Sequence, residues 1–562
     1  MKFRIAIFFL LLFIRGNGQI TTSPPFPAAT QKVTILFDSS KETHLGTYTG
    51  DLYAHTGVIF EGSSNWNHVI GSWGNNTTQP RLTNKGNGFY ELEISPDINT
   101  FYSVGSAEIV KKMAFVFRSS DGSRQTNNLY VDVYEEGLVI SVTSPADQVI
   151  VEKDSTLTIT AVSSQDASLK LKSGDNLLAE ATGKTISTTC TFTGSEWKWI
   201  IAEATTTEKT VRDSIRVYVK GPVIEQARPS GILKGINHIS DTEAALLLWA
   251  PGKEFVYLLG DFNDWQLNEN YQMKKDGEYF WLNLDGLTSG KPYVFQYYID
   301  GKLKIADPYC DQTSDPNDRF IPSETYPGLP AYPAGKTEGV ASVVQTGQAA
   351  YTWEVIGFIP PAKEKLVIYE ILVRDFTVEH TYLSVIDKLD YLKTLGVNVL
   401  ELMPVNEFEG NSSWGYNPSF YFAPDKFYGP ANNLKKLVDE AHKRGIAVVM
   451  DMVLNHSYGQ SPLVQMYWDA SNSRPSASNP WYNPVSNFQN PSAQWGYDFN
   501  HESSYTRQLV DSINSYWMKE YRMDGFRFDF TKGFSNTPYG PSDWGSAYDA
   551  ARIANLKRMA SE

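Results

Sequence analysis

Cysteine is almost absent from this sequence, which has only Cys190 and Cys310 among its 562 residues. A disulfide-rich scaffold is thereby excluded, and because the two residues fall in segments assigned below to different domains, no disulfide is expected. Long apolar runs are missing as well, since none approaches the length of about 20 residues that a membrane-spanning helix needs. A transmembrane protein is therefore not expected.

Excess positive charge is a further absence. The 49 Lys and Arg residues stand against 63 Asp and Glu, a net charge of -14 that is spread along the chain. This balance argues against nucleic acid as a partner and favours a neutral ligand. Aromatic residues, in contrast, are abundant, with 14 Trp, 32 Tyr and 29 Phe, many of them in Asn- and Gly-rich surroundings. Flat rings that face water suit the faces of sugars, although most rings in any protein belong to its core.

The N-terminus has the pattern of an export signal. Lys2 and Arg4 precede the apolar run 5–14, and the small residues Gly16 and Gly18 follow it. This order predicts a secretory signal peptide over residues 1–18. The protein is therefore expected to be secreted, periplasmic or held at the cell surface, and nothing in the sequence indicates its oligomeric state.

Short alternating runs that are typical of strands fill residues 19–222, separated by Gly, Asn, Asp and Ser. Two β-sandwich modules fit this span, one over residues 19–138 and an Ig-like one over residues 139–222. Two interpretations stay open for them. They are plain spacers, or they bind carbohydrate through exposed rings such as Trp66 and Trp73.

A third β module is predicted over residues 229–335. Its segment GDFNDW, residues 260–265, and the strands around it resemble the isoamylase-type N-terminal domain, a sandwich of the E-set kind. The turn within this segment either grips sugar or docks against the next domain.

The periodicity changes after residue 346. Continuous apolar strands, beginning with residues 366–373, alternate with amphipathic helices, which is the pattern of parallel βαβ units. Chemistry in such folds lies where strands end at their carboxyl side. The third strand ends in Asp451, Asn455 and His456, and the fourth contains Arg527 and Asp529. These last two share one face of the strand, so the cation favours the ionised carboxylate that a nucleophile requires.

Three motifs carry a family resemblance: DMVLNH at 451–456, GFRFDFTK at 525–532 and WGYNP at 414–418. They resemble the α-amylase superfamily of glycoside hydrolases, family 13. The resemblance implies that residues 346–562 are the first half of a (β/α)₈ barrel and that the protein cleaves α-glucans with retention of configuration. It assigns Asp529 as nucleophile and Arg527 as its positioning partner.

Other positions carry over from the same motifs. Tyr416 would stack on the sugar at the cleavage point, and Lys532 would reach the leaving-group side. Asn455 matches a position that often binds Ca²⁺, but Gly533 stands where many members have a His that helps to hold calcium or substrate, so calcium stays open. The full set of expected substrate contacts is Tyr416, Asp451, His456, Lys532 and Trp414.

The chain ends at Glu562, before the fifth strand on which such a barrel continues. Retaining hydrolysis needs a second carboxyl, the general acid, about 5 to 5.5 Å from the nucleophile. The family places this Glu, and a third carboxylate, on later strands, so these 562 residues are expected to be inactive alone.

Alternatives remain for the activity and for the longest loop. Debranching enzymes of the pullulanase or isoamylase kind and glucan-branching transferases share these motifs, and Lys532 favours an α-amylase among them. A glucan-binding protein with a degenerate barrel is the non-enzymatic alternative. The connection 457–503 is long for a βα loop and is expected to bind substrate. Two interpretations stay open for its rings, which either line a glucan groove or, for two or three of them, only anchor the loop: Trp468, Trp481, Tyr482, Trp495 and Tyr497.

Overall fold

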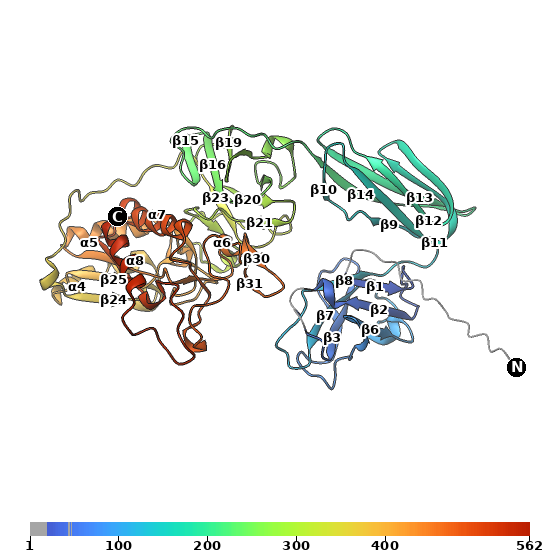
Figure 1. Ribbon diagram of the computed structural model, residues 1–562, viewed down its shortest axis with the longest axis horizontal. Coiled ribbons are helices and arrows are strands. Elements are labelled where there is room, and N and C mark those ends of the chain that lie inside the picture. The colour runs from blue at the N-terminus through green and yellow to red at the C-terminus, as the bar shows by residue number, and fades with distance from the viewer. Residues whose placement is uncertain (1–18, 43–44, 46–47) are drawn as a thin grey trace. The chain divides into compact units, whose positions relative to one another are not determined.

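The computed structural model describes residues 19–562 except 43–44 and 46–47 (Figure 1). The expected signal peptide, residues 1–18, lies outside the described residues. The chain divides into two compact units, one formed by residues up to 222 and the other by nearly all residues from 223 onward. Both units consist mostly of β-sheets. Within the described part, no helix is long and apolar enough to cross a membrane.

The first module of unit 1 contains two four-stranded sheets. Their strand orders are β1(Ile20–Ser23)-β2(Val33–Asp38)-β6(Phe89–Ile94)-β5(Thr83–Gly86) and β4(Asn67–Ile70)-β3(Leu52–Phe60)-β7(Val110–Ser119)-β8(Leu129–Asp132), and helix α1 is Ile98–Tyr102. Every second side chain of the central strands enters one shared core. Phe37 and Phe117 meet there from opposite sheets, with ring centroids 4.7 Å apart.

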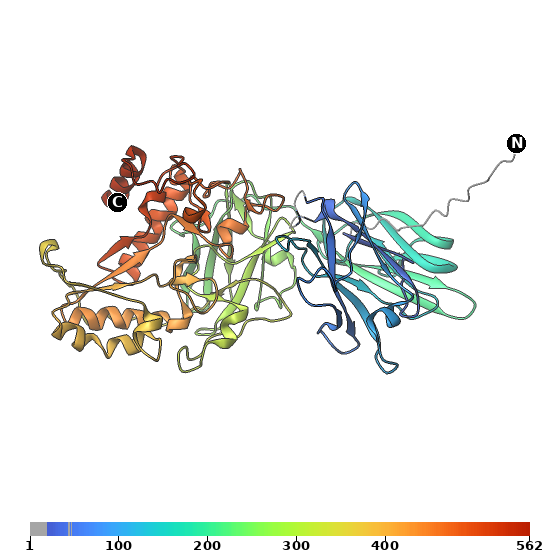
Figure 2. The ribbon, with the colours of Figure 1, turned by 90° about the horizontal axis from the view of Figure 1, so that it is seen from below.

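The second module of unit 1 differs from the two separate sheets expected for it. All six strands belong to one sheet: β9(Ile140–Ser144), β10(Val149–Glu152), β11(Thr156–Ser173), β12(Asn176–Thr191), β13(Trp197–Thr205) and β14(Thr210–Lys220). The polar stretch 163–167 continues as strand past an irregularity in the pairing with β12, so β11 pairs with β9 before this point and with β13 after it. The long pair of β11 and β12 is visible in cyan-green in Figures 1 and 2.

Unit 2 begins with a third β module that runs to residue 344, beyond the expected boundary at 335. One sheet has the order β15(Gly235–Ser240)-β16(Glu243–Trp249)-β19(Tyr279–Leu284)-β18(Lys274–Asp276), and the other β17(Val256–Gly260)-β20(Tyr293–Ile299)-β23(Ala341–Val344)-β22(Thr313–Ser314), with β21(Leu303–Ile305) beside β20. In the turn at 260–265 the Trp265 ring is buried and its Nε1 donates to Asp261 Oδ1 over 3.0 Å. The indole therefore stabilises its own turn and is not offered to solvent.

The rest of unit 2 is organised by a parallel sheet, β24(Ile368–Ile371)-β25(Val399–Leu402)-β28(Ala447–Met452)-β33(Gly525–Phe528). Helices alternate with these strands: α2(Val373–Phe376), α3(Tyr382–Ile386), α4(Leu389–Thr394), α5(Ala431–Lys443), α6(Pro462–Gln465), α7(Ser504–Glu520) and α8(Ala550–Ser561). Short antiparallel pairs decorate the connections: β26(Asn406–Phe408) with β27(Pro418–Pro424), β29(His456–Ser457) with β32(Tyr497–Asp498), and β30(Trp468–Asp469) with β31(Arg474–Pro475). The segment after α2 forms two short helices, α3 and α4, and not one continuous helix.

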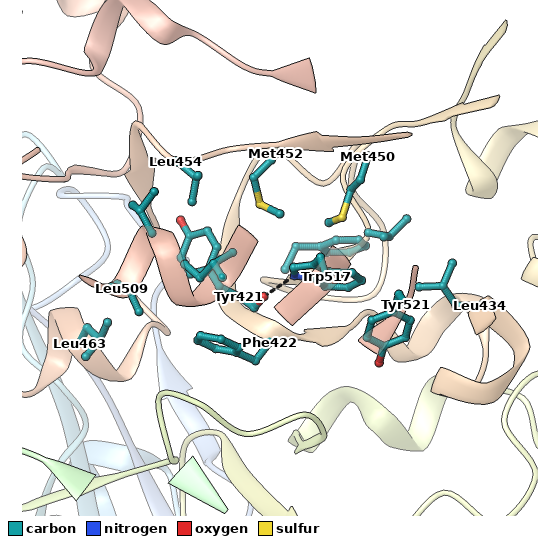
Figure 3. Close-up of a cluster of buried hydrophobic side chains, with 14 of the residues drawn as sticks. Tyr421, Phe422, Leu434, Met450, Met452, Leu454, Leu463, Leu509, Trp517 and Tyr521 are labelled. Atoms are coloured by element: carbon teal, nitrogen blue, oxygen red, sulfur yellow. Dashed lines mark hydrogen bonds between the residues drawn. The ribbon is translucent and has the colours of Figure 1, made fainter. Parts of the chain in front are cut away.

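The face of β28 that packs against α7 is apolar. Figure 3 shows Met450 and Met452 pointing toward Trp517 of α7, whose Nε1 donates to the Tyr421 carbonyl over 2.7 Å. Because side chains alternate along a strand, Asp451 between the two methionines points to the opposite face. Because α7 packs on the methionine face, Asp451 lies on the face of the sheet that points away from α7.

The third β module and the parallel sheet share one hydrophobic core. Trp249 at the end of β16 stacks on Tyr505 of α7, with ring centroids 4.6 Å apart. A buried ion cluster joins the same two parts: Lys426 Nζ lies 2.9 Å from both Asp318 Oδ1 and Glu407 Oε1 and donates to Thr313 Oγ1 over 2.6 Å. The module at 229–344 is therefore a structural part of unit 2.

Candidate active site

The strand-end residues of the two central motifs are neighbours in the sheet. Strands β28 and β33 run parallel, and their register places Asp451 opposite Arg527. Asp529 follows β33, where its backbone N–H still donates to the Met452 carbonyl over 3.0 Å. Two motifs that lie about 75 residues apart in sequence are thus brought together at the carboxyl edge of the sheet.

Arg527 connects the two carboxylates. Its Nη1 donates to Asp451 Oδ2 over 2.8 Å and to Asp529 Oδ1 over 2.7 Å. One guanidinium nitrogen therefore serves both acids. Asp451 is fully buried, and this burial raises the pKa of its carboxyl, while hydrogen bonds from Tyr416 and Arg527 oppose the shift.

Tyr416 completes the polar cluster from the 414–418 motif. Its hydroxyl donates to Asp451 Oδ2 over 2.7 Å. The preceding Gly415 has a φ of 90°, and a Cβ there would lie 2.3 Å from the Pro404 carbonyl oxygen. Only glycine fits this turn without strain, so the turn fixes where the Tyr416 ring lies.

His456 is held as a neutral imidazole beneath this cluster. Its Nε2 donates to the Tyr416 carbonyl over 3.0 Å, and its Nδ1 accepts from Asn455 Nδ2 over 2.7 Å. Burial lowers the pKa of His456 to about 4, against smaller opposing effects of the Tyr416 carbonyl and Asp529. At neutral pH the ring therefore donates a hydrogen bond without carrying charge.

The residues around Asn455 offer little for a calcium ion. Asn455 Oδ1 is buried without a hydrogen-bond partner, as a cation ligand would be. However, calcium takes about six to eight oxygen ligands, and among the described residues no group of three or more His, Cys, Asp or Glu gathers as a metal site. A Cβ at Gly533 would lie 2.9 Å from the Asn455 Cβ, so the glycine there makes room for Asn455 itself. Calcium binding stays a prediction, and no chemical step is derived from it.

Lys532 and Trp414 lie at the margin of the cluster. Lys532 Nζ donates to Ser546 Oγ over 3.0 Å, and the Trp414 ring is 60% exposed. Neither observation tests the roles expected for Lys532 and Trp414 at the sugar.

Two acidic residues on the same face of the parallel sheet as Asp451 were missed in the sequence analysis. Glu370 of β24 and Glu401 of β25 are register partners. Burial raises the pKa of Glu401, and the charges of Glu370 and Asp451 add to this effect. Both interrupt otherwise apolar strands, and that interruption was the signal that could have identified them.

The long connection 457–503 contributes fewer open rings than expected. Trp481 and Tyr482 are buried, where Trp481 packs against Trp249 and Tyr482 stacks on Phe499 with centroids 4.6 Å apart. These two rings therefore anchor the loop to the core, which is the second of the two interpretations, and they do not line an open groove. Tyr497 is half-buried, whereas Trp468 and Trp495 keep exposed faces.

Trp495 of the long connection packs against Phe530, a ring next to the polar cluster that the sequence analysis did not single out. Its centroid lies 4.9 Å from that of Phe530, the residue after Asp529, and 6.3 Å from that of the exposed Trp544. Phe530 has a φ of 38°, which is uncommon for an aromatic residue. The local backbone thus turns sharply beside the expected nucleophile, with two exposed indoles close by.

Comparison with known proteins agrees with the motifs. Residues 381–496 match the family described as alpha amylase, catalytic domain. The chain is 31% identical over 287 residues to malto-oligosyltrehalose trehalohydrolase of Saccharolobus solfataricus, which covers 50% of this chain and 43% of that protein. It is 33% identical over 280 residues to the chloroplastic isoamylase 1 of Oryza sativa subsp. japonica, which covers 44% and 32%.

Among solved structures, a putative alpha amylase from Salmonella typhimurium aligns at 25% identity and a TM-score of 0.44, over 59% of this chain and 48% of that one. The chain spans less than half the length of the two curated relatives. The family match over residues 381–496 and the curated relatives place this part of the chain in the α-amylase superfamily.

Proposed function

We propose that this protein is an exported glycoside hydrolase that cleaves α-glucans with retention of configuration. The single observation that carries the proposal is the bridge from Arg527 Nη1 to Asp451 and Asp529 at the carboxyl ends of two adjacent parallel strands. The proposal includes the architecture: the parallel sheet is part of a (β/α)₈ barrel, and the N-terminal sheets form sandwiches.

In the proposed reaction Asp529 is the nucleophile. Its Oδ1 is held by Arg527, so the carboxylate keeps a fixed orientation for attack on the anomeric carbon of the sugar. Asp451 Oδ1, which has no hydrogen-bond partner, is proposed to accept from a sugar hydroxyl. His456 is proposed to act beside the sugar by holding the Tyr416 backbone through its Nε2, because Asn455 already occupies its other ring nitrogen. The proton donor that a retaining hydrolase also needs is assigned by the family resemblance to a Glu on a strand after the fourth.

The substrate class is proposed from the relatives. Their names are malto-oligosyltrehalose trehalohydrolase, isoamylase and 1,4-alpha-glucan branching enzyme. These names support an α-glucan as substrate. Similarity to isoamylase favours debranching as the second candidate, and comparing turnover of linear amylose with that of branched glycogen separates the two.

The test is Asp529→Asn in the full protein. This change keeps the shape and removes the attacking charge, so turnover of a malto-oligosaccharide should fall on the order of 10⁴-fold or more. Affinity for the sugar and the melting temperature should stay near those of the wild type. Asp511→Asn is the matched control, because Asp511 also pairs with an arginine, Arg558, at 2.7 Å but lies on α7.

Near-normal turnover in well-folded Asp529→Asn would remove Asp529 from the mechanism. A wild-type protein that binds malto-oligosaccharide without cleaving any α-glucan would instead support the non-catalytic alternative, a glucan-binding protein with a degenerate barrel.

A further inference from the structure

The sheet β4-β3-β7-β8 of unit 1 has an outer face that its own core does not use. On β3, Ala54 enters the core, whereas His55 points outward; on β8, Leu129 and Val131 pack against the core, whereas Tyr130 points outward. Between β3 and β8 lies β7, which places the small residue Ala114 on this outer face. Ala114 of β7 pairs with both Tyr130 and Gly57.

A connected row of aromatic rings covers this outer face. The Trp73 ring meets that of His55 edge-on at 4.8 Å, His55 stacks on Trp66 at 5.6 Å, and Trp66 meets Tyr130 at 6.4 Å. Trp73 and Tyr130, at the two ends of the row, are 54% and 47% exposed. The four residues His55, Trp66, Trp73 and Tyr130 are called the aromatic platform below. Exposed aromatic surface of this extent indicates a binding site.

The aromatic platform is held from below by a hydrogen-bond network. Gln79 joins His55 Nδ1 to Arg118, with contacts of 3.0 Å to the imidazole and 2.7 Å to the guanidinium. Arg118 is buried, and its guanidinium lies 5.5 Å from the centre of the Tyr53 ring. Displacing Arg118 would break its hydrogen bonds and leave a buried charge unpaired, which costs free energy. Because Arg118 fixes Gln79 and Gln79 contacts His55, the His55 ring is restrained, and the platform is pre-organised.

The surroundings of the aromatic platform favour a neutral ligand. Burial and the nearby Arg118 lower the pKa of His55, so the imidazole is uncharged at neutral pH. Lys112 and Asp132, next to the platform on β7 and β8, pair with each other at 2.9 Å. Four amide side chains stand within three residues of Trp66 or Trp73 in sequence, Asn65, Asn67, Asn75 and Asn76. That of Asn76 is engaged by Arg118 and the Ser120 carbonyl. Amides can hydrogen-bond hydroxyl groups while the rings cover apolar C–H faces.

We propose that His55, Trp66, Trp73 and Tyr130 form a non-catalytic binding site for a neutral α-glucan chain. The choice of an α-glucan rests on the function proposed above for the same chain. The ring geometry excludes a flat platform of coplanar rings, because the interplanar angles along the row are 81°, 21° and 74°. An α-1,4-glucan is a coiled chain, whereas a β-1,4-glucan is a flat ribbon that needs coplanar rings.

The test measures sugar binding in the full protein that carries Asp529→Asn, so that the sugar stays intact. Trp66→Ala/Trp73→Ala should weaken binding to granular starch at least about tenfold, since two stacking rings are lost. Trp199→Ala is the matched control, because Trp199 in the second module of unit 1 is 51% exposed but lies outside the platform, and its binding should equal that of the parent. Cellohexaose should bind neither protein measurably.

A second variant covers the case in which the double variant does not fold. Trp73→Ala alone removes the most exposed ring and should weaken starch binding about threefold or more with an unchanged melting temperature. Starch binding equal to the parent in both variants overturns the platform, as expected if its rings contact a protein instead of sugar. Platform-dependent binding of cellohexaose but not of starch overturns the ligand class.

Turnover by the wild-type protein separates this proposal from the function on which it rests. Normal hydrolysis of a short malto-oligosaccharide, with starch binding unaffected by the Trp changes, would refute the platform alone. Platform-dependent starch binding in a wild-type protein without turnover would refute the catalytic proposal and leave the platform supported.

Discussion

Replacing Lys426 by methionine is expected to destabilise unit 2 strongly. The Nζ of Lys426 lies 2.9 Å from Asp318 and from Glu407, and all three side chains are nearly inaccessible to water. Burial alone lowers the pKa of Lys426, but Glu407 and Asp318 outweigh it and raise the pKa. Removing the cation leaves two carboxylates buried without compensation, which costs about 3 to 5 kcal/mol.

This loss should appear as a lower melting temperature of the full protein in scanning calorimetry, by about 5 to 15 °C. The drop should be smaller at pH 5.5 than at pH 7.5, because burial raises the pKa of Asp318 to about 6 and protonation removes a charge that Lys426 no longer balances. Adding Asp318→Asn and Glu407→Gln to the variant should recover most of the loss.

Lys443→Met is the matched control. Lys443 also contacts two carboxylates, both at 2.7 Å, but in a solvent-exposed setting, so its replacement should change the melting temperature little. A Lys426→Met protein that melts like the wild type, or whose drop is equal at both pH values, would refute the reasoning.

Three further predictions concern the candidate active site. Arg527→Lys should lower kcat at least about tenfold, because the shorter lysine side chain cannot bring one nitrogen to both acids. Sugar affinity and melting temperature serve as controls. A kcat equal to that of the wild type would contradict this reasoning. Gly415→Ala should displace Tyr416 and cost about 1 to 3 kcal/mol in urea unfolding, and an unchanged midpoint would show that the turn tolerates a side chain. Because burial lowers the pKa of His456 to about 4 from about 6.5 in the unfolded chain, its contribution to stability is complete above pH 6.5 and is lost as the pH falls toward 4. The difference in unfolding free energy between wild type and His456→Gln should therefore narrow by about 2 kcal/mol between pH 7 and pH 4.5, and a constant difference would count against it.

The sequence predicted the elements whose pattern is local. Parallel strands appear as continuous apolar runs, and the structure places β28 and β33 where those runs indicated, with Asp451 and Arg527 adjacent. The alternation of side chains was enough to put Arg527 and Asp529 on one face, and the two are in contact. What these residues do with a sugar remains a prediction.

Properties that depend on distant parts of the chain were not predictable. Trp481 stands among Asn and Pro residues, and the sequence left open whether it lines a groove or anchors the loop. Its partner in the core, Trp249, lies more than 200 residues earlier. The buried Lys426 cluster likewise joins residues from three separate segments, none of which carries a local signal. The one-sheet arrangement of the second module was missed because the polar run 163–167 resembles a turn in isolation.

The anchored rings of the connection 457–503 have a consequence for how substrate preference can change. Trp481 and Tyr482 fasten the loop to the core, so the exposed Trp495 and its neighbour Trp544 can be exchanged without loosening the scaffold. Under the proposed function, substitutions at Trp495 and Trp544 are expected to change which sugar chains bind, while the hydrogen bonds between Arg527 and its two acids stay in place. Under the proposed function, the same fold is expected to acquire a different substrate preference through a few surface substitutions. A mutational library confined to Trp495 and Trp544 tests this expectation.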